Sequence, residues 1–246
     1  MAFDTTARGQ LRIDCVLCPV QRCLGRTGNG EEVEAWQEAL LPRRAVMPGG
    51  AALFNTGDKQ CNVYSVRGGC LKAYTVDADG NERIRGFYFP GDLVGLDALG
   101  GGYHLSTAVA VVPSQVCAAP LEQLKRLMGR QPQLAQHVVE QTSRELALAL
   151  ALSGDFSAEQ RLAAFLLHMR ERLGGETLHL PMSQRDIGDY LRLATETVCR
   201  TLKGFERRGW LTVSARQIRL RDAGALRRLA QAVVLPNADR DWAQAA

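Results

Sequence analysis

The stretch from Met182 to Trp210, MSQRDIGDYLRLATETVCRTLKGFERRGW, constrains the fold more than any other part of this 246-residue chain. Ser183 and Asp186 have the spacing of a capping box, which satisfies free amides at the start of a helix. Apolar residues then recur at helical intervals, first as Ile187, Tyr190 and Leu191 and later as Val198, Leu202 and Phe205. The pattern predicts two helices joined by a short turn, the second of which begins near Thr195.

The outward face of the second helix carries side chains that suit the major groove of DNA. A glutamate accepts a hydrogen bond from cytosine, an arginine binds guanine with two hydrogen bonds, and threonine or lysine holds phosphate. An ordinary helical hairpin with a charged outer face is the alternative interpretation. The candidate DNA-binding residues in this stretch are Ser183, Thr195, Glu196, Thr197, Cys199, Arg200 and Lys203.

The residues that follow favour DNA binding over the plain hairpin. Leu211–Val213 and Gln217–Leu220 alternate like the two strands of a hairpin, with Arg216 at its tip. Such a hairpin is a wing, and Arg216 would reach a phosphate. A closing helix is expected from Asp222 to Val234, so that residues 155–246 form a DNA-binding domain.

Residues 182–210 resemble the winged helix-turn-helix of the Crp/Fnr family of transcription regulators. Glu196-x-x-Cys199-Arg200 lies where the oxygen-responsive fumarate-nitrate reduction branch has Glu-x-x-Ser-Arg. Arg192 stands where the turn usually has Gly, which costs roughly 1 kcal/mol if the backbone φ there is positive. The resemblance runs from about Leu11 to Leu229. It implies an α+β fold with an N-terminal cyclic-nucleotide-binding-type β-roll, a long central dimerisation helix and a C-terminal winged helix-turn-helix.

The charge distribution agrees with a nucleic-acid partner. The net charge is +4, but Ser183 to Ala230 holds eleven Lys and Arg against five Asp and Glu, a local charge of +6 that leaves −2 elsewhere. No run of about 18 apolar residues suggests a membrane span. The first ten residues lack the apolar region of an export signal, so we expect a cytoplasmic protein.

The cysteines suggest a metal site rather than disulfides. Seven cysteines form an odd number, and Cys15, Cys18 and Cys23 fall within nine positions. Thiolates at such spacing suit zinc or an iron–sulfur cluster. A fourth ligand would come from Cys61, Cys70, Cys117, Cys199 or a histidine. The four histidines are scattered, and we interpret each as structural or solvated, with a small reservation for His104 as a haem ligand.

The resemblance narrows this choice. The oxygen-responsive branch holds a [4Fe–4S] cluster with an N-terminal cysteine cluster and one distant cysteine that precedes a Pro and a short helix. Cys117, followed by Pro120, matches that context. The resemblance therefore implies four ligands: Cys15, Cys18 and Cys23 from the N-terminal segment, residues 1–32, and Cys117 from the β-rich domain. Four residues separate Cys18 from Cys23, whereas the family usually has five. A zinc site and four unconnected thiols are the alternatives.

Residues 33–130 have the pattern of a small all-β domain. Short apolar runs alternate with Gly-rich turns, which predicts strands over Asn62–Val66, Leu71–Val76, Ile84–Phe89 and Thr107–Val112. Nucleotide-binding relatives place a Gly-Glu pair and an Arg-Ser pair around the cyclic phosphate. This chain has Gly91-Asp92 and no Arg beside Ser106, and an uncompensated phosphate is costly to bury. We therefore expect no cyclic nucleotide.

Residues 131–154 are predicted to form a dimerisation helix. The tail from Leu146 to Leu152 alternates Leu and Ala, which on its own suggests a strand, but both residues favour helices and the upstream text is helical. In a helix, Leu146, Leu148, Leu150 and Leu152 form two adjacent stripes that are too apolar to stay exposed. They would meet a two-fold copy; burial on the chain's own β-roll is the alternative.

These expectations combine into one function. The chain would be a homodimeric transcription regulator that binds palindromic double-stranded DNA, senses oxygen or redox state through its cluster and, by resemblance, contacts RNA polymerase. One rival is a regulator of the same family gated by haem, nitric oxide or a nucleotide, with zinc-bound or idle cysteines. Another is a cysteine-based redox enzyme or electron-transfer protein. No catalytic grouping or phosphate-binding loop stands out, so we expect no enzyme.

Overall fold

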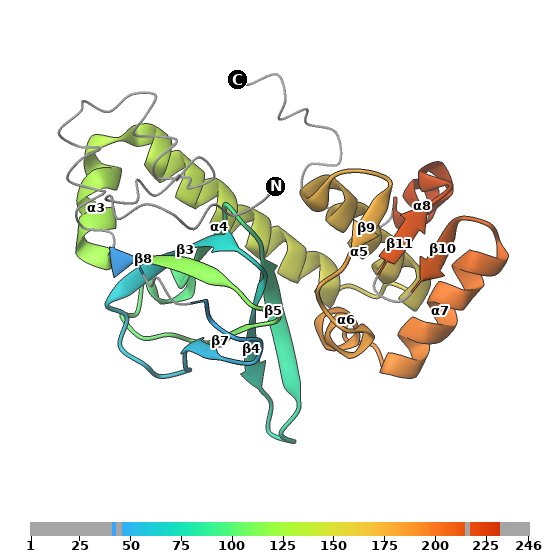
Figure 1. Ribbon diagram of the computed structural model, residues 1–246, viewed down its shortest axis with the longest axis horizontal. Helices are drawn as coiled ribbons and strands as arrows, with labels where there is room; N and C mark the ends of the chain where they lie inside the picture. Colours follow the sequence, from blue (N-terminus) through green and yellow to red (C-terminus); the bar gives the residue numbers. More distant parts are fainter. Residues whose placement is uncertain (1–40, 43–45, 215–216, 232–246) are drawn as a thin grey trace, which may run out of the picture.

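A long helix joins the two parts of the molecule. The computed structural model describes residues 41–42, 46–214 and 217–231. Within the long helix, the side chains of residues 151–153 are not described. Figure 1 shows the β-rich part below this helix and the C-terminal helical part at the end of it. This arrangement follows from the change in sequence pattern, from short alternating runs before residue 120 to helical periodicity after it.

The β-rich part is a β-roll of two antiparallel sheets whose apolar faces meet. One sheet has the order β1-β8-β3-β6 and the other β2-β7-β4-β5. Alternation along β4 buries Leu71 and Ala73, and Leu71 joins Val66 and Val116 in the apolar cluster between the sheets. The strands are β1 (Leu41–Pro42), β2 (Ala52–Phe54), β3 (Asn62–Gly68), β4 (Leu71–Val76), β5 (Glu82–Tyr88), β6 (Leu93–Val94), β7 (Thr107–Ala110) and β8 (Gln115–Pro120), with a 3-10 turn η1 (Leu96–Ala98).

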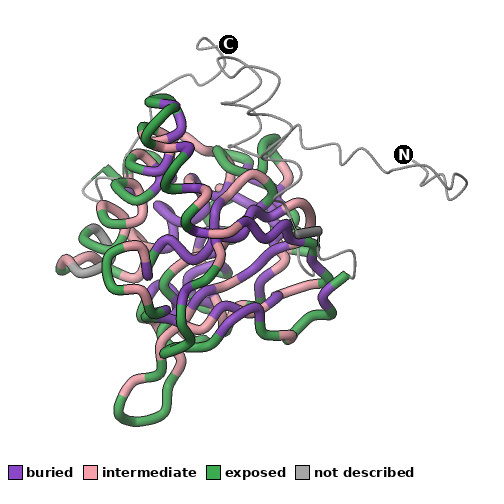
Figure 2. The backbone as a smooth tube through the Cα atoms, turned by 90° about the vertical axis from the view of Figure 1, so that its left-hand side faces the viewer, coloured by how far each residue is buried: buried purple, intermediate pink, exposed green. Residues whose placement is uncertain are grey.

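The four predicted strands are confirmed, although some bounds differ. β3 ends two residues later than predicted, β5 begins two residues earlier and ends one earlier, and β7 ends two residues earlier. The turn from β3 to β4 requires glycine at Gly69, where φ is +82° and a Cβ would lie 2.3 Å from Ser114 Oγ. The β4–β5 hairpin ends in an exposed tip around Gly80, which projects from the body of the molecule in Figure 2. Buried positions in the same view follow the strands.

Two helices follow the β-roll: α3 (Leu121–Arg130) and α4 (Pro132–Ser153). The Leu-Ala alternation is therefore helical, as predicted. Leu134 and Val138 of α4 pack into one apolar cluster with Leu124 of α3 and with Val63 and Leu93 of the β-roll. None of the described helices is long and apolar enough to cross a membrane.

Gln141 fixes α4 to the edge of a sheet. Its side-chain Oε1 accepts from Leu93 N at 3.2 Å and its Nε2 donates to Leu93 O at 2.7 Å. The amide is buried, and β6 is the last strand of its sheet. The side chain thus forms the pair of hydrogen bonds that a neighbouring strand would form.

The C-terminal part is a helical domain with a small sheet. A capping box of Ser157 and Gln160 starts its first helix. Leu166, Leu178, Phe205 and Leu226 are completely or almost completely buried in its core. Its elements are α5 (Ala158–Leu173), β9 (Thr177–His179), α6 (Gln184–Leu191), α7 (Thr195–Arg207), β10 (Leu211–Ser214), β11 (Gln217–Leu220) and α8 (Ala223–Ala230).

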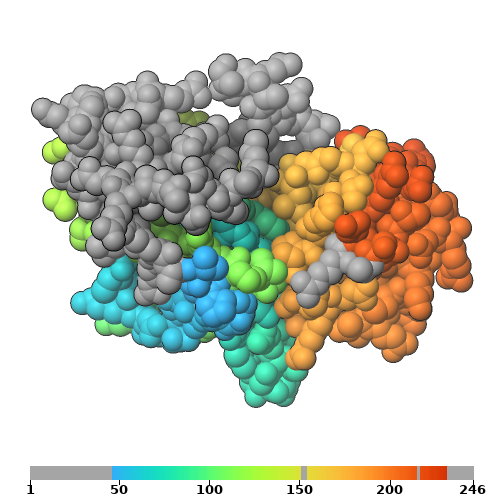
Figure 3. Space-filling model, in the orientation of Figure 1, coloured from blue at the N-terminus to red at the C-terminus, as the bar shows by residue number. Residues whose placement is uncertain are grey.

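The two parts share one apolar cluster. Phe87 and Phe89 of the β-roll belong to the same buried group as Phe165 and Tyr190 of the C-terminal domain. The Phe87 and Tyr190 ring centroids are 5.3 Å apart. Figure 3 shows the β4–β5 region in teal against the α6 region in orange. The C-terminal domain is therefore docked on the β-roll through side chains as well as tethered by α4.

Candidate nucleic-acid interface

Helices α6 and α7 and the turn between them have the predicted helix-turn-helix form. The capping box of Ser183 and Asp186 is present in both directions: Asp186 N donates to Ser183 Oγ at 3.1 Å and Ser183 N donates to Asp186 Oδ2 at 2.9 Å. The Ser183 hydroxyl itself donates to Asp186 Oδ2 at 2.6 Å. Its single hydroxyl hydrogen is therefore engaged in the cap rather than aimed at a phosphate.

The turn between the helices contains the expected strain. Arg192 has φ 56° and ψ 46°, and it is the one non-glycine residue with positive φ among the described residues. The turn lies close against α6: Leu193 N donates to Gly188 O at 2.9 Å, and a Cβ on Gly188 would lie 2.6 Å from Leu193 O. The chain thus adopts the left-handed turn of the motif without the glycine that suits it.

The recognition helix α7 separates an apolar face from a charged face. Val198, Leu202 and Phe205 are buried in the domain core, as predicted. Thr195, Glu196, Arg200 and Lys203 are exposed, and Thr197 and Cys199 are half-buried. Within the described part of the chain, Glu196, Arg200 and Lys203 form no ion pair, so their charged groups are available to a ligand such as DNA.

Cys199 has a partner at the start of the preceding helix. Its thiol donates to Gln184 Oε1, with Sγ and Oε1 2.7 Å apart. This contact turns the carbonyl end of the Gln184 amide toward α7 and leaves its NH₂ group to other acceptors. The sequence pattern predicts Cys199 beside the DNA face but gives no signal for Gln184.

The wing is a three-stranded sheet in the order β10-β11-β9. The two predicted strands are confirmed as β10 and β11, while β9, which pairs with β11, was not predicted because Thr177–His179 is too short to show alternation. Ser214 and Gln217 flank the hairpin tip. The predicted phosphate contact Arg216 lies outside the described residues.

Cys117 is the one predicted cofactor ligand within the described residues; Cys15, Cys18 and Cys23 lie outside them. It is buried on β8, opposite Pro42 of β1, and belongs to the cluster that contains Leu134 and Val138 of α4. Among the described residues no group of three or more His, Cys, Asp and Glu is arranged to hold a metal. Any site at Cys117 therefore needs donors from elsewhere in the chain.

The other described cysteines of the β-roll differ from Cys117 in environment. Cys70 is completely buried, and this burial, followed by the nearby Asp92 carboxylate, raises the pKa of its thiol to about 12. Such a thiol stays protonated and is a poor metal ligand. Cys61 is exposed at the start of β3, where its carbonyl accepts from Leu121 N at 3.0 Å.

The predicted dimerisation residues fall into different environments along α4. Leu146 and Leu150 are 61% and 65% exposed, and Val139, which the sequence analysis did not single out, is 63% exposed one heptad before Leu146. Leu148 packs instead against the apolar cluster of its own chain. The side chain of Leu152 lies outside the described residues. The exposed apolar stripe on α4 thus consists of Val139, Leu146 and Leu150.

The positions that surround a cyclic phosphate in nucleotide-binding relatives are engaged within this chain. Asp92 pairs with Arg172 of α5 and accepts from Phe89 N at 2.7 Å. Asp97 Oδ2 accepts from Ser106 Oγ at 2.7 Å and from Leu105 N at 3.1 Å. The Asp97 carboxylate thus accepts the hydrogen bonds of Ser106 Oγ and Leu105 N within the β-roll itself.

His104 completes this buried polar group. Its Nδ1 lies 3.3 Å from Asp97 Oδ1, and its ring stacks on Phe54 with centroids 3.6 Å apart. The side chain is 3% exposed. The stacking on Phe54 and the contact with Asp97 hold this buried ring in place.

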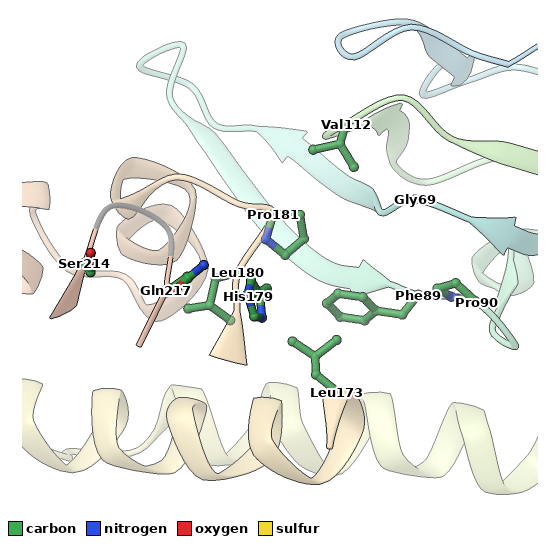
Figure 4. Close-up of a pocket in the computed structure, with 10 residues that line it drawn as sticks. All are labelled: Gly69, Phe89, Pro90, Val112, Leu173, His179, Leu180, Pro181, Ser214 and Gln217. Atoms are coloured by element: carbon green, nitrogen blue, oxygen red, sulfur yellow. The ribbon is translucent and has the colours of Figure 1, made fainter. Parts of the chain in front are cut away.

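A cavity of about 790 Å³ lies between the β-roll and the wing. Figure 4 shows Phe89 and Pro90 on one side, Leu173 at the end of α5, and Ser214 and Gln217 on the strands beside the wing tip. Its walls are mainly apolar. The cavity shows that the docked domains leave a gap on the wing side of their contact.

His168 in the middle of α5 is half-buried. Desolvation, and then the nearby guanidinium groups of Arg172 and Arg144, lower its pKa to about 4, so that the imidazole is uncharged near neutral pH.

Comparisons with known proteins agree with this geometry. A model of the Crp-like helix-turn-helix domain matches residues 160–229, and a model of the cyclic nucleotide-binding domain matches residues 44–131. The fumarate and nitrate reduction regulatory proteins of Escherichia coli K12 and Salmonella typhimurium LT2 are each 36% identical over 232 residues, which cover 90% of this chain and 92% of the relative. The structure of FixK2 from Bradyrhizobium japonicum matches with a TM-score of 0.70 and 33% identity over 77% of this chain and 96% of that chain.

The two matched domains lie in the same order as the β-roll and the winged helix-turn-helix seen here, and the relatives are regulators rather than enzymes. Regulators of this family act as dimers. The chain is therefore a member of the Crp/Fnr family of DNA-binding transcription regulators.

Proposed function

We propose that this regulator is a cytoplasmic homodimer that reads a palindromic DNA site with α7. The supporting observation is the exposed charged face of that helix, in which Glu196 and Arg200 have no internal ion pair among the described residues. In the major groove Glu196 accepts from cytosine and Arg200 binds guanine. Thr195, Thr197 and Lys203 hold phosphates or the neighbouring base edge.

Other predicted DNA contacts have supporting roles in this proposal. Ser183 contributes through the helix start that it caps, since its hydroxyl hydrogen is donated to Asp186. Cys199 acts with Gln184, to which its thiol donates. Arg216 at the wing tip supplies a further phosphate contact.

The two-fold partner would meet this chain along α4. The apolar stripe on α4 consists of Val139, Leu146 and Leu150, and all three side chains are exposed in the single subunit. Because water contact with such a stripe is unfavourable, we expect the second subunit to cover it. Residues 131–154 would then place two recognition helices one turn of DNA apart. A DNA-bound dimer would also contact RNA polymerase, by resemblance to the family.

For the signal, we propose a [4Fe–4S] cluster held by Cys15, Cys18, Cys23 and Cys117. The donor set fits, because thiolates are the usual ligands of such clusters. Cys117 also fits by its position: it lies on the strand that pairs with β1, the first described element after the N-terminal segment that contains the other three cysteines. When bound, the cluster would supply iron–sulfur bonds that react with oxygen, next to Cys117.

The position of Cys117 supports the proposal, because Cys117 packs against α4, the helix of the proposed dimer contact. Cys117 belongs to a group of buried apolar side chains that includes Leu134 and Val138 of α4 and Leu93 of β6. The backbone of Leu93 is hydrogen-bonded to the side chain of Gln141, also on α4. A change in how Cys117 is held would therefore alter the packing of α4, and with it the dimer stripe on the same helix.

The test is the iron and acid-labile sulfide content of protein purified without oxygen. We expect about four of each per subunit, lost on air exposure together with DNA affinity. Cys117→Ser should remove the cluster, whereas Cys61→Ser, in the same β-roll, should keep it. Zinc in place of iron, or DNA binding that is indifferent to air, would contradict the proposed sensor and leave the DNA-binding assignment intact.

A further inference from the structure

Lys72 of the β-roll reaches across the domain boundary to the helix-turn-helix. Its Nζ donates to Asp186 Oδ1 at 2.9 Å, and to Glu82 Oε2 of its own hairpin at 2.7 Å. The Lys72 and Asp186 side chains are 15% and 17% exposed, against 37% for Glu82. Solvent and salt screen such a half-buried pair less than a pair on the open surface.

The same carboxylate caps the first helix of the DNA-binding motif. Asp186 Oδ2 accepts from the backbone and hydroxyl of Ser183, while Oδ1 accepts from Lys72. One oxygen therefore serves the start of α6 and the other serves the β-roll. If α6 moved away from β4, Asp186, which caps the first turn of α6, would lose its contact with Lys72.

Both partners remain charged in this arrangement. Burial alone would lower the pKa of Lys72, but the hydrogen bonds to Glu82 and Asp186 outweigh it and raise that pKa. Burial would raise the pKa of Asp186, but the hydrogen bonds from Ser183 and Lys72 outweigh it and lower that pKa. The pair is thus an ion pair over the whole neutral range.

Apolar contacts beside the pair fix the direction of docking. The rings of Phe87, Phe165 and Tyr190 contact one another with centroids between 5.3 and 6.5 Å apart. These contacts engage α6 and α5, whereas Glu196, Arg200 and Lys203 of α7 stay exposed. Docking therefore limits the orientation of α7 without covering its DNA face.

We propose that Lys72 is a positioning residue for DNA recognition, which acts through Asp186. It holds α6, and hence α7, in one orientation relative to the β-roll within a single subunit. A recognition helix that is already oriented loses less freedom when DNA binds, so its affinity is higher. The inference rests on the DNA-binding function of the family and is independent of the proposed cluster.

The experiment uses the full-length chain, purified and assayed without oxygen, and the palindromic DNA that the wild type selects from a random library. Lys72→Gln should weaken binding of that DNA by about tenfold, the size expected when a pre-ordered contact is lost. Glu82→Gln removes the other partner of Lys72 but not Asp186, and it should stay within about twofold of the wild type. Lys72→Arg, which keeps the charge, should restore most of the affinity.

Two further measurements separate positioning from other roles. The double variant Lys72→Gln/Asp186→Asn should bind no more weakly than Asp186→Asn alone, because the two groups act as one contact. The slope of affinity against salt should be unchanged in Lys72→Gln, because Lys72 touches no phosphate. If the Gln variant unfolds, Lys72→Met keeps the apolar stem and serves in its place.

Wild-type or tighter affinity in Lys72→Gln would overturn the proposal, as would a shallower salt slope, which would make Lys72 a phosphate contact. A wild-type chain that selects no DNA would overturn the family function as well. That result is seen before any variant is made, so the two failures are distinguishable.

Discussion

The DNA-binding half and the sensory half of this chain build their sites in different ways. The DNA face comes from one helix, where Glu196, Arg200 and Lys203 lie within eight positions and are held by the core directly beneath them. The proposed sensor draws Cys117 from a strand and three cysteines from the other end of the chain. A local site depends on one helix, whereas a site assembled from distant segments depends on the whole fold and can therefore respond to a signal.

The largest expected effect tests the assembled site. Cys18→Ala should abolish the cluster and reduce DNA affinity without oxygen by at least about 100-fold, because a [4Fe–4S] cluster needs its thiolates. The measurement is iron content together with DNA binding of protein kept free of air. Cys61→Ala is the matched control. Full anaerobic binding by the Cys18 variant would show that the two halves are not linked through this cysteine.

The next effect tests the local site. Arg200→Ala should cost about 1–3 kcal/mol of binding free energy and relax specificity at one base pair, because a guanine loses its bidentate partner. Competition with all single-base variants of the selected site measures this. Lys203→Gln should weaken every sequence alike. The same uniform loss for Arg200→Ala would make Arg200 a phosphate contact.

An effect of similar size concerns the stability of the helical domain that carries the local site. His168 has a pKa of about 4 in the folded chain, below its value of 6.5 in the unfolded chain. The unfolded state therefore binds the proton first, and the free energy of unfolding should fall between about pH 6.5 and 4 by on the order of 1–3 kcal/mol. His168→Gln should remove this slope in urea unfolding. An equal slope in the variant would assign the acid sensitivity to other groups.

The smallest effect returns to the helix-turn-helix. Arg192→Gly should raise the free energy of unfolding by roughly 1 kcal/mol, because glycine adopts the positive φ without strain. Thermal unfolding of both proteins measures it. Arg192→Ala, which keeps the Cβ, should give no such gain; an equal gain from Ala would mean that the arginine side chain and not its backbone is unfavourable.

The difference between local features and features assembled from distant segments also explains what the sequence could predict. The capping box of Ser183 and Asp186, the buried face of α7 and the strained turn at Arg192 follow from spacing, and the structure confirms them. Neither β6 nor β9 was predicted, because strands of two or three residues carry no readable alternation. The contacts of Lys72 with Asp186, 114 positions apart, and the packing of Leu148 on its own core depend on tertiary structure.

The amide of Gln141 has a consequence for solubility. A strand at the edge of a sheet, such as β6, can recruit a strand from another molecule through its unpaired backbone groups. The Gln141 side chain is hydrogen-bonded to Leu93 N and Leu93 O, so these two backbone groups cannot pair with a strand of another molecule. Any displacement of α4 would uncover them. The helix that would join two subunits in an ordered dimer therefore also guards the β-roll against disordered association.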